Sequence, residues 1–503
     1  MEAILSLRWL NGKAVGLIVA LLVVGGGFAI LTSLSPEQQK AILYFTQDYL
    51  PIAMFITLGL LLFSGYPVAF ILGGLALLYG LIGYMLGVFS LIEFFNFLPR
   101  IWGQAAENLV LVAVPAFVFM GIMMERSGIA NDLLYTVQVL LKRVPGALAL
   151  AVTIMGTILA AMTGIIGASV TMMTALALPT MMRQGYSHAL ACGTIAASGT
   201  LGILIPPSIM LIIMADLMSV SVGNVFMAAW GPGLCLVALY VLFVVVVATV
   251  RPDLAPKLPP NLLHVPRGEL GPLVLRAFIP PVFLIGLIKG AILFGWSTPS
   301  EAGAVGAFGA MMLAWFNGRL NYQTLESVCH SAGRTVAMIF FIIISATCFA
   351  YVYRSLGGDV VVDDLITSAG FGSWGLLFLI MGIVFFLGFF LDWIEITLIV
   401  LPVFAPLVAG LDFGDHVAKE DMILWFIILM AVNLQTSFLT PPFGFALFYL
   451  KGIAPREVKI QSIYLGIIPF VLLQLGALIV VMAYPNVALW LMHTVYASGG
   501  GGD

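Results

Sequence analysis

The chain has 503 residues, of which 62% are hydrophobic and 9% are charged, whereas roughly a quarter of the residues in a soluble protein carry charge. This composition excludes a soluble globular protein and favours a polytopic membrane protein whose surface is solvated by lipid. The formal net charge is −3 and the basic residues form no cluster, which excludes the positive face that nucleic-acid binding requires.

Continuous apolar runs recur along the chain and indicate membrane-spanning helices rather than the alternating strands of a barrel. Two of them, 146–182 and 374–410, are too long for one crossing of about 20 residues and barely long enough for two. In chain order, the expected apolar runs lie near residues 14–33, 51–65, 67–88, 108–124, 146–182, 188–219, 225–250, 277–295, 300–316, 334–353, 374–410, 423–450 and 461–484.

The charges of the loops assign sides to these runs. Basic residues gather in the loops 125–145, 183–187 and 251–276, which the positive-inside rule places in the cytoplasm. Acidic residues dominate the loops 354–373 and 411–422, which are then external. Each overlong run therefore enters and leaves by one face. Two full crossings per run would also bring the chain back to the face from which it started. The length of each run, however, favours two re-entrant helical hairpins of opposite orientation.

The resulting fold class is an all-α membrane protein with about 11 transmembrane helices plus the two hairpins, the N-terminus in the cytoplasm and the C-terminus in the periplasm. The segment Thr174–Pro179, at the end of the first hairpin, resembles Thr397–Pro402 at the end of the second. After each hairpin comes a span that contains two adjacent prolines, and proline cannot donate to the helix ladder, so both spans should break. Such a pattern is typical of an inverted-repeat secondary transporter with its site near the midplane.

The broken helices and hairpins supply the candidate site residues. Unwound carbonyls and small polar side chains suit a hard cation such as Na⁺. The candidate Na⁺ ligands are Gly167, Ser169, Thr171, Ser198, Gly199, Thr200, Asp392, Asn433, Gln435 and Thr436. The candidate substrate-binding or broken-helix residues are Pro206, Pro207, Ser208, Glu395, Thr440, Pro441 and Pro442.

Each candidate group has a competing interpretation. Asp392 and Glu395 could cap the second helix of their hairpin, and Ser169 and Thr171 could be packing residues. No transition metal and no cofactor beyond the coupling ion is expected, because the five histidines are scattered singly. An intramembrane enzyme would need a nucleophile and base or a metal site, and a channel would need a filter, and the sequence offers neither.

Three motifs carry a family resemblance. Gly164–Val170, Ile205–Ser208 and Thr440–Gly444 resemble the large permease subunit of tripartite ATP-independent periplasmic (TRAP) transporters, the DctM-like family. The resemblance covers roughly residues 51–484. It implies an elevator-type fold in the bacterial inner membrane and Na⁺-coupled import of a small organic acid: a dicarboxylate, 2-oxo acid, hydroxy acid or sugar acid.

The resemblance also implies two partners, a small four-helix membrane subunit and a periplasmic substrate-binding protein. An autonomous Na⁺ or H⁺/carboxylate symporter that needs no binding protein is the alternative. The first hydrophobic segment departs from the family pattern. We expect it to be a retained helix, although Arg8 and Lys13 before an apolar core could also mark a cleavable signal peptide.

The expected organisation alternates scaffold and transport segments. It comprises an extra N-terminal transmembrane helix and external loop (1–50), first-half scaffold helices (51–145), a first hairpin and broken helix of the transport domain (146–250), a cytoplasmic linker (251–276), second-half scaffold helices (277–373), a second hairpin and broken helix of the transport domain (374–460), and a last helix and tail (461–503).

Overall fold

The computed structural model describes residues 36–62, 64–163, 166–257, 267–441 and 444–499. Within these ranges the chain forms helices and no β-strand, which confirms the expected all-α class. By length and apolar composition, five described helices can cross a membrane, or six if a bent pair counts as one span. The expected span at 14–33 lies outside the described residues, and the total of eleven spans stays a prediction.

Two helical pairs stand where the overlong runs were expected. The first consists of α8 (Ala147–Thr163) and α9 (Ile166–Arg183), and the second of α18 (Ser373–Leu387) and α19 (Trp393–Ala409). The two helices of each pair pack against each other. The arms have 15 to 18 residues, fewer than the roughly 20 that a crossing takes. Their length therefore fits hairpins better than two full crossings each.

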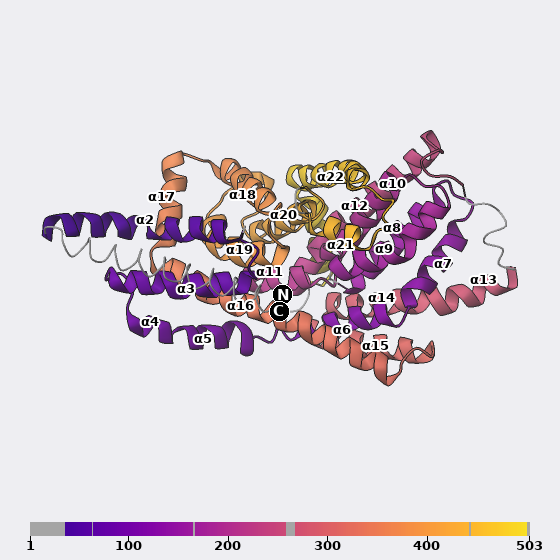
Figure 1. The fold of residues 1–503 in the computed structure, drawn as a ribbon, viewed down its shortest axis with the longest axis horizontal. Coiled ribbons are helices and arrows are strands. Elements are labelled where there is room, and N and C mark those ends of the chain that lie inside the picture. Colours follow the sequence, from indigo (N-terminus) through magenta and orange to yellow (C-terminus); the bar gives the residue numbers. More distant parts are fainter. Residues whose placement is uncertain (1–35, 63, 164–165, 258–266, 442–443, 500–503) are drawn as a thin grey trace, which may run out of the picture.

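Both expected helix breaks are confirmed. The first proline pair lies between α10 and α11, and the second lies between α20 and α21. The segment beyond each break packs against the hairpin of the other half, α11 on α19 and α21 on α9. The two halves are thus interlocked at the centre of the molecule (Figure 1). The bounds are α10 His188–Thr200, followed by the 3₁₀ turn η2 Leu201–Ile203, α11 Ile209–Leu217, α20 Met422–Ser437 and α21 Phe445–Ile453.

A long helix, α16 (Tyr322–Ser355), runs obliquely through the structure and packs on α3, α6 and α19 (Figure 1). Its 34 residues span about 50 Å, so it touches both the scaffold and the second hairpin. The other helices are α2 Pro36–Leu62, α3 Val68–Met85, α4 Leu91–Phe95, α5 Phe97–Ile101, the π-turn η1 Trp102–Ala106, α6 Ala113–Arg126, α7 Ile129–Leu141, α12 Val222–Val250, α13 Arg267–Leu273, the π-turn η3 Val274–Phe278, α14 Ile279–Leu293, α15 Pro299–Phe316, α17 Gly358–Ala369, the 3₁₀ turn η4 Gly414–His416, α22 Ile460–Ala483 and α23 Asn486–Gly499.

Four segments that the sequence analysis treated as loop or tail are helical. Residues 36–50 belong to α2, α7 occupies most of the loop 125–145, α17 occupies most of the loop 354–373, and α23 replaces the tail. Both α7 and α23 are half-buried, with an apolar face packed on α8 and on α12 respectively. Counting charges cannot separate such an amphipathic helix from a loop, because the polar face of the helix carries the same charges.

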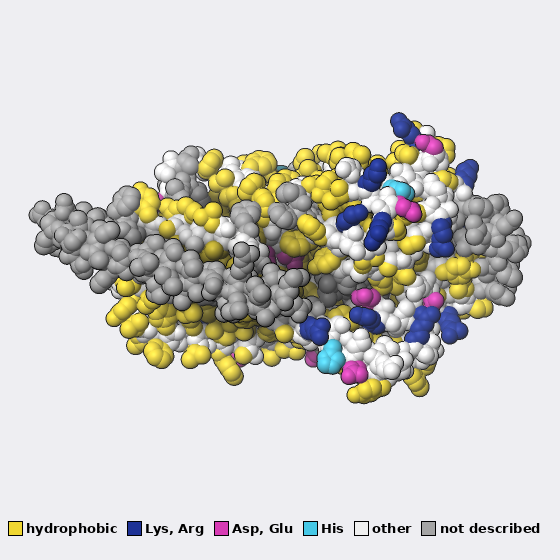
Figure 2. Space-filling model, in the orientation of Figure 1, with side chains coloured by type: hydrophobic (Ala, Val, Ile, Leu, Met, Phe, Trp, Pro, Cys, Tyr) yellow, Lys and Arg dark blue, Asp and Glu magenta, His cyan; other side chains and the backbone are white. Residues whose placement is uncertain are grey.

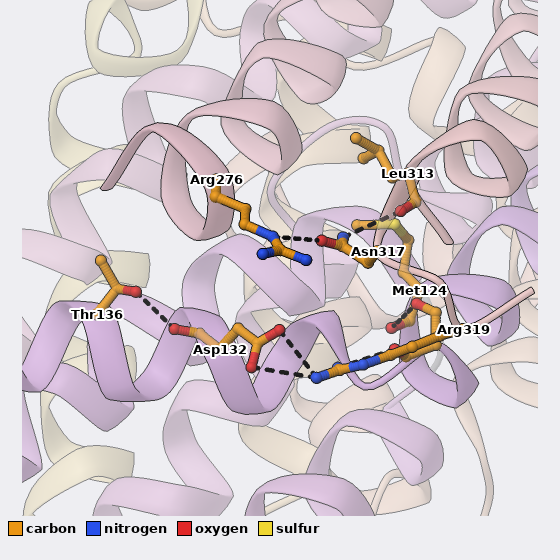
Figure 3. Close-up of polar contacts among 8 residues, drawn as sticks. Met124, Asp132, Thr136, Arg276, Leu313, Asn317 and Arg319 are labelled. Atoms are coloured by element: carbon orange, nitrogen blue, oxygen red, sulfur yellow. Dashed lines mark hydrogen bonds and ion pairs between the residues drawn. The ribbon is translucent and has the colours of Figure 1, made fainter. Parts of the chain in front are cut away.

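A polar cluster fixes the 66° bend between α6 and α7 (Figure 3). The Arg319 guanidinium donates to the Ser127 carbonyl at 3.0 Å and lies 3.1 Å from an Asp132 carboxylate oxygen. Gly128, between the two helices, has φ +66°, a left-handed conformation that glycine adopts without strain. A Cβ there would also lie 2.6 Å from an Arg319 nitrogen. The bend is therefore built into the scaffold.

The charged side chains are distributed unevenly over the surface. Figure 2 shows Lys and Arg gathered over the right-hand end of the molecule, the end where α7 and α13 lie, whereas the flanks are largely hydrophobic. Basic side chains concentrated at one end are the distribution that the positive-inside rule predicts for a membrane protein.

Candidate functional site

The two hairpin tips meet at a small cavity of about 90 Å³. Gly167, at the start of α9, comes from the first hairpin, and Asp392 comes from the turn of the second. Of the predicted site residues, these two are brought together here. The remaining lining residues are Ile166, Ile209, Thr335, Met338, Ile339, Trp393, Ile394, Phe438, Phe445 and Tyr449. We call this space the hairpin-tip cavity.

Four helices begin at this cavity. Ile166, Ile209, Trp393 and Phe445 line it, and they are the first residues of α9, α11, α19 and α21. A helix N-terminus carries a partial positive charge, and two of these are capped by side chains, α11 by Ser208 and α19 by Asp392. The start of α21 has no side-chain cap, and the N–H groups of Ala446 and Leu447 donate to the carbonyls of Phe438 and Gly444. The arrangement favours an anion although no Lys or Arg lines the cavity among the residues that the structure describes.

Asp392 is both a helix cap and a lining residue. Its carboxylate accepts from the Trp393 N–H at 2.8 Å, and the Glu395 carboxylate accepts from the Asp392 N–H at 3.1 Å. This capping box confirms the cap interpretation for both residues. Glu395 does not line the cavity, whereas Asp392 does. Only Asp392 therefore combines the cap with a position where it can act on a bound ion or substrate.

The predicted residues of the first half gather where α10 meets the first hairpin. A Cβ on Gly199 would overlap the Val170 side chain, and a Cβ on Gly156 would lie 2.6 Å from that of Ser198. Ser198 and Thr200 are fully buried and donate their hydroxyls to the carbonyls of Thr194 and Ala197. Their oxygens keep lone pairs that can accept or coordinate.

The predicted residues of the second half form a matching cluster where α20 meets the second hairpin. The Asn433 amide donates to the Met381 carbonyl of α18 at 2.7 Å. The Thr436 hydroxyl donates to the Asn433 carbonyl at 2.6 Å. Gly388 lies against Ser437 so closely that a Cβ would overlap the Ser437 side chain. The sequence predicted one set of ligands, and the structure assembles two clusters, one for each half.

Several buried oxygens in these clusters have no hydrogen-bond partner. Gln435 is fully buried, and neither its amide oxygen nor its amide nitrogen is paired. The hydroxyls of Ser437, Thr397 and Thr194 are also buried without a hydrogen-bond partner. A buried unpaired polar group costs about 1 to 3 kcal/mol, and such groups in native structures call for an explanation. A hard cation would pair the oxygens, so the donor set fits Na⁺.

The remaining predictions have structural roles or lie outside the site. Pro206, Pro207 and Ser208 are buried in the first break, and the Ser208 hydroxyl caps α11 while donating to the Ile203 carbonyl at 2.6 Å. The Thr440 hydroxyl donates to the Thr436 carbonyl. Ser169 is fully buried and Thr171 partly buried on α9, and Pro441 is partly buried after α20. Pro442 lies outside the described residues.

Among the lining residues that the sequence did not predict, two carry hydroxyl groups, Thr335 and Tyr449. The Tyr449 ring lies against Gly167, where a Cβ would come within 2.8 Å of it, and Thr335 reaches the cavity from α16. Tyr449 fell in the expected run 423–450 without being singled out, and Thr335 belonged to an expected scaffold span. Their polarity within apolar runs was the only signal, and it did not point to this cavity.

Replacing Gly388 by Ala is expected to separate the second hairpin from α20 and to lower the activity of the protein at least about tenfold, because overpacking a tight contact costs typically 1–3 kcal/mol. The double variant Gly388→Ala/Ser437→Gly removes the overlapping side chain and should recover most of the loss. The measurement is thermal stability in detergent together with transport. A double variant no better than Gly388→Ala would show that the contact does not carry the effect.

Comparison with known proteins identifies the family. Residues 55–487 match the family model described as "Tripartite ATP-independent periplasmic transporter, DctM component". The chain belongs to the DctM family. It is thus a TRAP large permease subunit, a multi-pass membrane protein and a secondary transporter subunit rather than an enzyme, and the TRAP family implies a tripartite system with a small membrane subunit and a periplasmic binding protein.

Named relatives agree with this assignment. The chain is 30% identical over 77% of its length to the C4-dicarboxylate TRAP transporter large permease protein DctM of Pseudomonas aeruginosa, covering 87% of that protein. It is 28% identical over 77% of its length to the ectoine/5-hydroxyectoine TRAP transporter large permease protein UehC of Ruegeria pomeroyi, again covering 87%.

A solved structure supports the fold. The crystal structure of the YdaH transporter of Alcanivorax borkumensis matches with a TM-score of 0.54 at 13% identity, covering 80% of this chain and 89% of that one. At this identity the match concerns the fold alone. The DctM component and this transporter therefore share an architecture.

Proposed function

We propose that this DctM component imports a small organic acid, driven by Na⁺, after a periplasmic binding protein delivers the acid. The observation that carries the proposal is the convergence of four helix N-termini from both halves on the hairpin-tip cavity. That geometry binds a carboxylate without a basic side chain. It is also the arrangement by which discontinuous helices hold anionic substrates in secondary transporters.

The relatives support the substrate class. The Pseudomonas protein is named for C4-dicarboxylates and the Ruegeria protein for ectoine and 5-hydroxyectoine, and all of these contain a carboxylate. We expect a dicarboxylate, 2-oxo acid, hydroxy acid or sugar acid as substrate of this chain. Asp392, beside the cavity, would then repel a second carboxylate unless a cation neutralises it.

Sodium coupling is supported by the two polar clusters. Each cluster lies between a hairpin and the end of its own broken helix, and the second contains the unpaired Gln435 amide. Binding of Na⁺ at either cluster would draw the hairpin and the broken helix together. This contact would position the helix N-termini for the substrate, so ion binding and substrate binding would favour each other.

Transport by this geometry would be an elevator-like motion. The hairpins and broken helices form one interlocked body, because α11 packs on α19 and α21 packs on α9. α16 lines the hairpin-tip cavity but belongs to the surrounding scaffold with α3, α6 and α15. A substrate held between these two parts changes sides when one moves against the other, in the inner membrane with the N-terminus in the cytoplasm and the C-terminus in the periplasm.

The experiment is uptake into proteoliposomes that contain this chain and the small membrane subunit, with labelled succinate, 2-oxoglutarate, lactate or gluconate. An inward Na⁺ gradient and the loaded binding protein are each present or absent. Uptake that needs both is expected. Uptake with Na⁺ alone would identify an autonomous symporter, and uptake indifferent to Na⁺ would contradict the proposed coupling.

Replacing Gln435 by Leu is expected to raise the Na⁺ concentration for half-maximal uptake roughly 10- to 100-fold, the range for loss of a residue that supports a metal site. Because Leu removes a buried unpaired amide, the variant should be at least as stable as the parent chain. Gln323→Leu, exposed at the start of α16 and lining neither the hairpin-tip cavity nor the cavity of about 440 Å³ described below, is the matched control. A Gln435→Leu variant with unchanged Na⁺ dependence would exclude this residue from the ion site.

A further inference from the structure

A second and larger cavity, of about 440 Å³, lies apart from the hairpin-tip cavity. Two arginines line it, Arg100 on α5 and Arg354 at the end of α16, together with the polar side chains of Thr347 and Tyr351. Its volume is in the range of small-molecule pockets, about 300–1,000 Å³. We call it the arginine cavity.

Three helices connect the two cavities. α11 contributes Ile209 to the hairpin-tip cavity and Asp216 to the arginine cavity. Likewise, α19 contributes its first residues to one cavity and the stretch 398–405 to the other, and α16 contributes 335–339 and 346–355. On α16 the two stretches are seven residues apart, about 10 Å of helix. The arginine cavity is therefore the space at the far ends of the helices that build the hairpin-tip cavity.

The two guanidinium groups are held differently. Arg354 donates to the Pro402 carbonyl at 2.5 Å and lies 3.6 Å from an Asp359 carboxylate oxygen, which fixes its position on α19 and leaves other N–H donors unused. Arg100 lies over the Tyr351 ring, 5.2 Å from its centroid, and forms no ion pair within the part of the chain that the structure describes. A guanidinium stacked on an aromatic ring keeps its edge free for a carboxylate.

The acidic side chain of Asp216 also lines the arginine cavity, but its carboxylate is already hydrogen-bonded. Both oxygens of the Asp216 carboxylate accept from the Asn108 amide at 2.8 Å. Both carboxylate oxygens are thus paired with Asn108, and neither forms an ion pair with an arginine among the described residues. A carboxylate ligand can therefore reach Arg100 and Arg354, whose planar donors suit it.

The cavity belongs to the side that the loop charges assign to the exterior. Arg354 opens the acidic segment 354–373, and Asp216 lies near the end of the run 188–219 that is opposite the cytoplasmic loop 183–187. In Figure 2, the Lys and Arg side chains gather at the opposite end of the molecule. A small acid that arrives from outside would meet the arginine cavity before the hairpin-tip cavity.

We propose that the arginine cavity is a waiting site that captures the carboxylate of the incoming acid on Arg100 and Arg354 before the acid moves along α16 to the hairpin tips. This inference rests on the proposed function for its substrate class. The site raises the local concentration of substrate and is not part of the translocating contact. Its loss should therefore affect capture rather than the maximal rate.

The first test measures uptake of the acid in the reconstituted system described above with Arg100→Gln and with Arg251→Gln as the matched control. Arg251 is exposed and lies at the end of α12, remote from both cavities. Arg100→Gln is expected to raise the half-saturating substrate concentration about tenfold, as for loss of a charged hydrogen bond, with a maximal rate within twofold of the parent. An unchanged half-saturating concentration overturns the proposal.

The second test measures ligand binding without transport. Ala350 lines the arginine cavity, and an Ala350→Cys variant of the full chain in detergent is alkylated with and without succinate, 2-oxoglutarate, lactate or gluconate. At least one acid should slow alkylation at position 350 about fivefold, whereas its neutral amide should not, and adding Arg100→Gln should abolish the protection. The exposed native Cys329 is the internal control and should react at the same rate throughout.

The two tests separate the possible failures. Protection at position 350 without uptake of any acid would support the waiting site and contradict the proposed transport. Uptake without protection by any of the four acids would overturn the waiting site alone. If Arg100→Gln raises only the half-saturating concentration of the loaded binding protein, with protection by free acid unchanged, the cavity docks an acidic protein surface and the proposal is overturned.

Discussion

Asp392→Asn is expected to lower Na⁺-driven uptake roughly 10- to 100-fold, the loss typical of removing a supporting group at a metal site. Asp392 is the acidic residue that lines the hairpin-tip cavity among the described residues. Its carboxylate can attract the coupling ion toward the substrate, and the neutral amide cannot. The measurement is the initial rate of uptake at several Na⁺ concentrations.

The variant also separates the two roles of this residue. Asn caps helices about as well as Asp, so Asp392→Asn should retain the cap on α19 and unfold close to the parent temperature. Asp392→Ala removes the cap as well and should cost about 1 kcal/mol of stability. If Asp392→Asn transports like the parent while Asp392→Ala does not, the carboxylate serves only as a cap.

The helix breaks, the overlong apolar runs and the helix cap could be predicted because each depends on residues close together in the sequence. Adjacent prolines end a helix wherever they occur, and the charges on either side of an overlong apolar run fix its entry and exit faces. The structure has a helical pair at each overlong run and a break at each proline pair, and the membrane faces of the two pairs stay a prediction. The capping box of Asp392 and Glu395 also follows from spacing alone.

Contacts between the halves could not be predicted in this way. Nothing in the segment 445–453 indicates that Tyr449 lies against Gly167 of the other half, or that α11 packs on α19. Tertiary packing decides these contacts, and in lipid no hydrophobic driving force distinguishes a helix face that packs on protein from one that faces lipid tails. The same limit explains why the predicted ion ligands separated into two clusters. Their spacing places them upstream of each break, but spacing does not say which elements pack against them.

Gly466→Ala is expected to destabilise the protein by about 3 kcal/mol, at the upper end of overpacking effects. The helices α10 and α22 approach through glycines: a Cβ on Gly466 would overlap the Ala189 carbonyl, and a Cβ on Gly193 would overlap the Gly466 carbonyl. Both obstacles are backbone atoms, which cannot turn aside as a side chain does. The helices must therefore separate.

The separation should reach the site, because α10 carries Ser198 and Thr200 at its other end. We therefore expect Gly466→Ala to lose folded protein in detergent and to weaken Na⁺ dependence in whatever fraction remains. Gly476→Ala is the matched control on the same helix, since nothing lies within 4 Å of a Cβ there, and it should be neutral or slightly stabilising because Ala favours helix over Gly. Equal unfolding temperatures for the two variants would show that α10 and α22 can move apart at little cost, and that the ion-binding end of α10 does not depend on this contact.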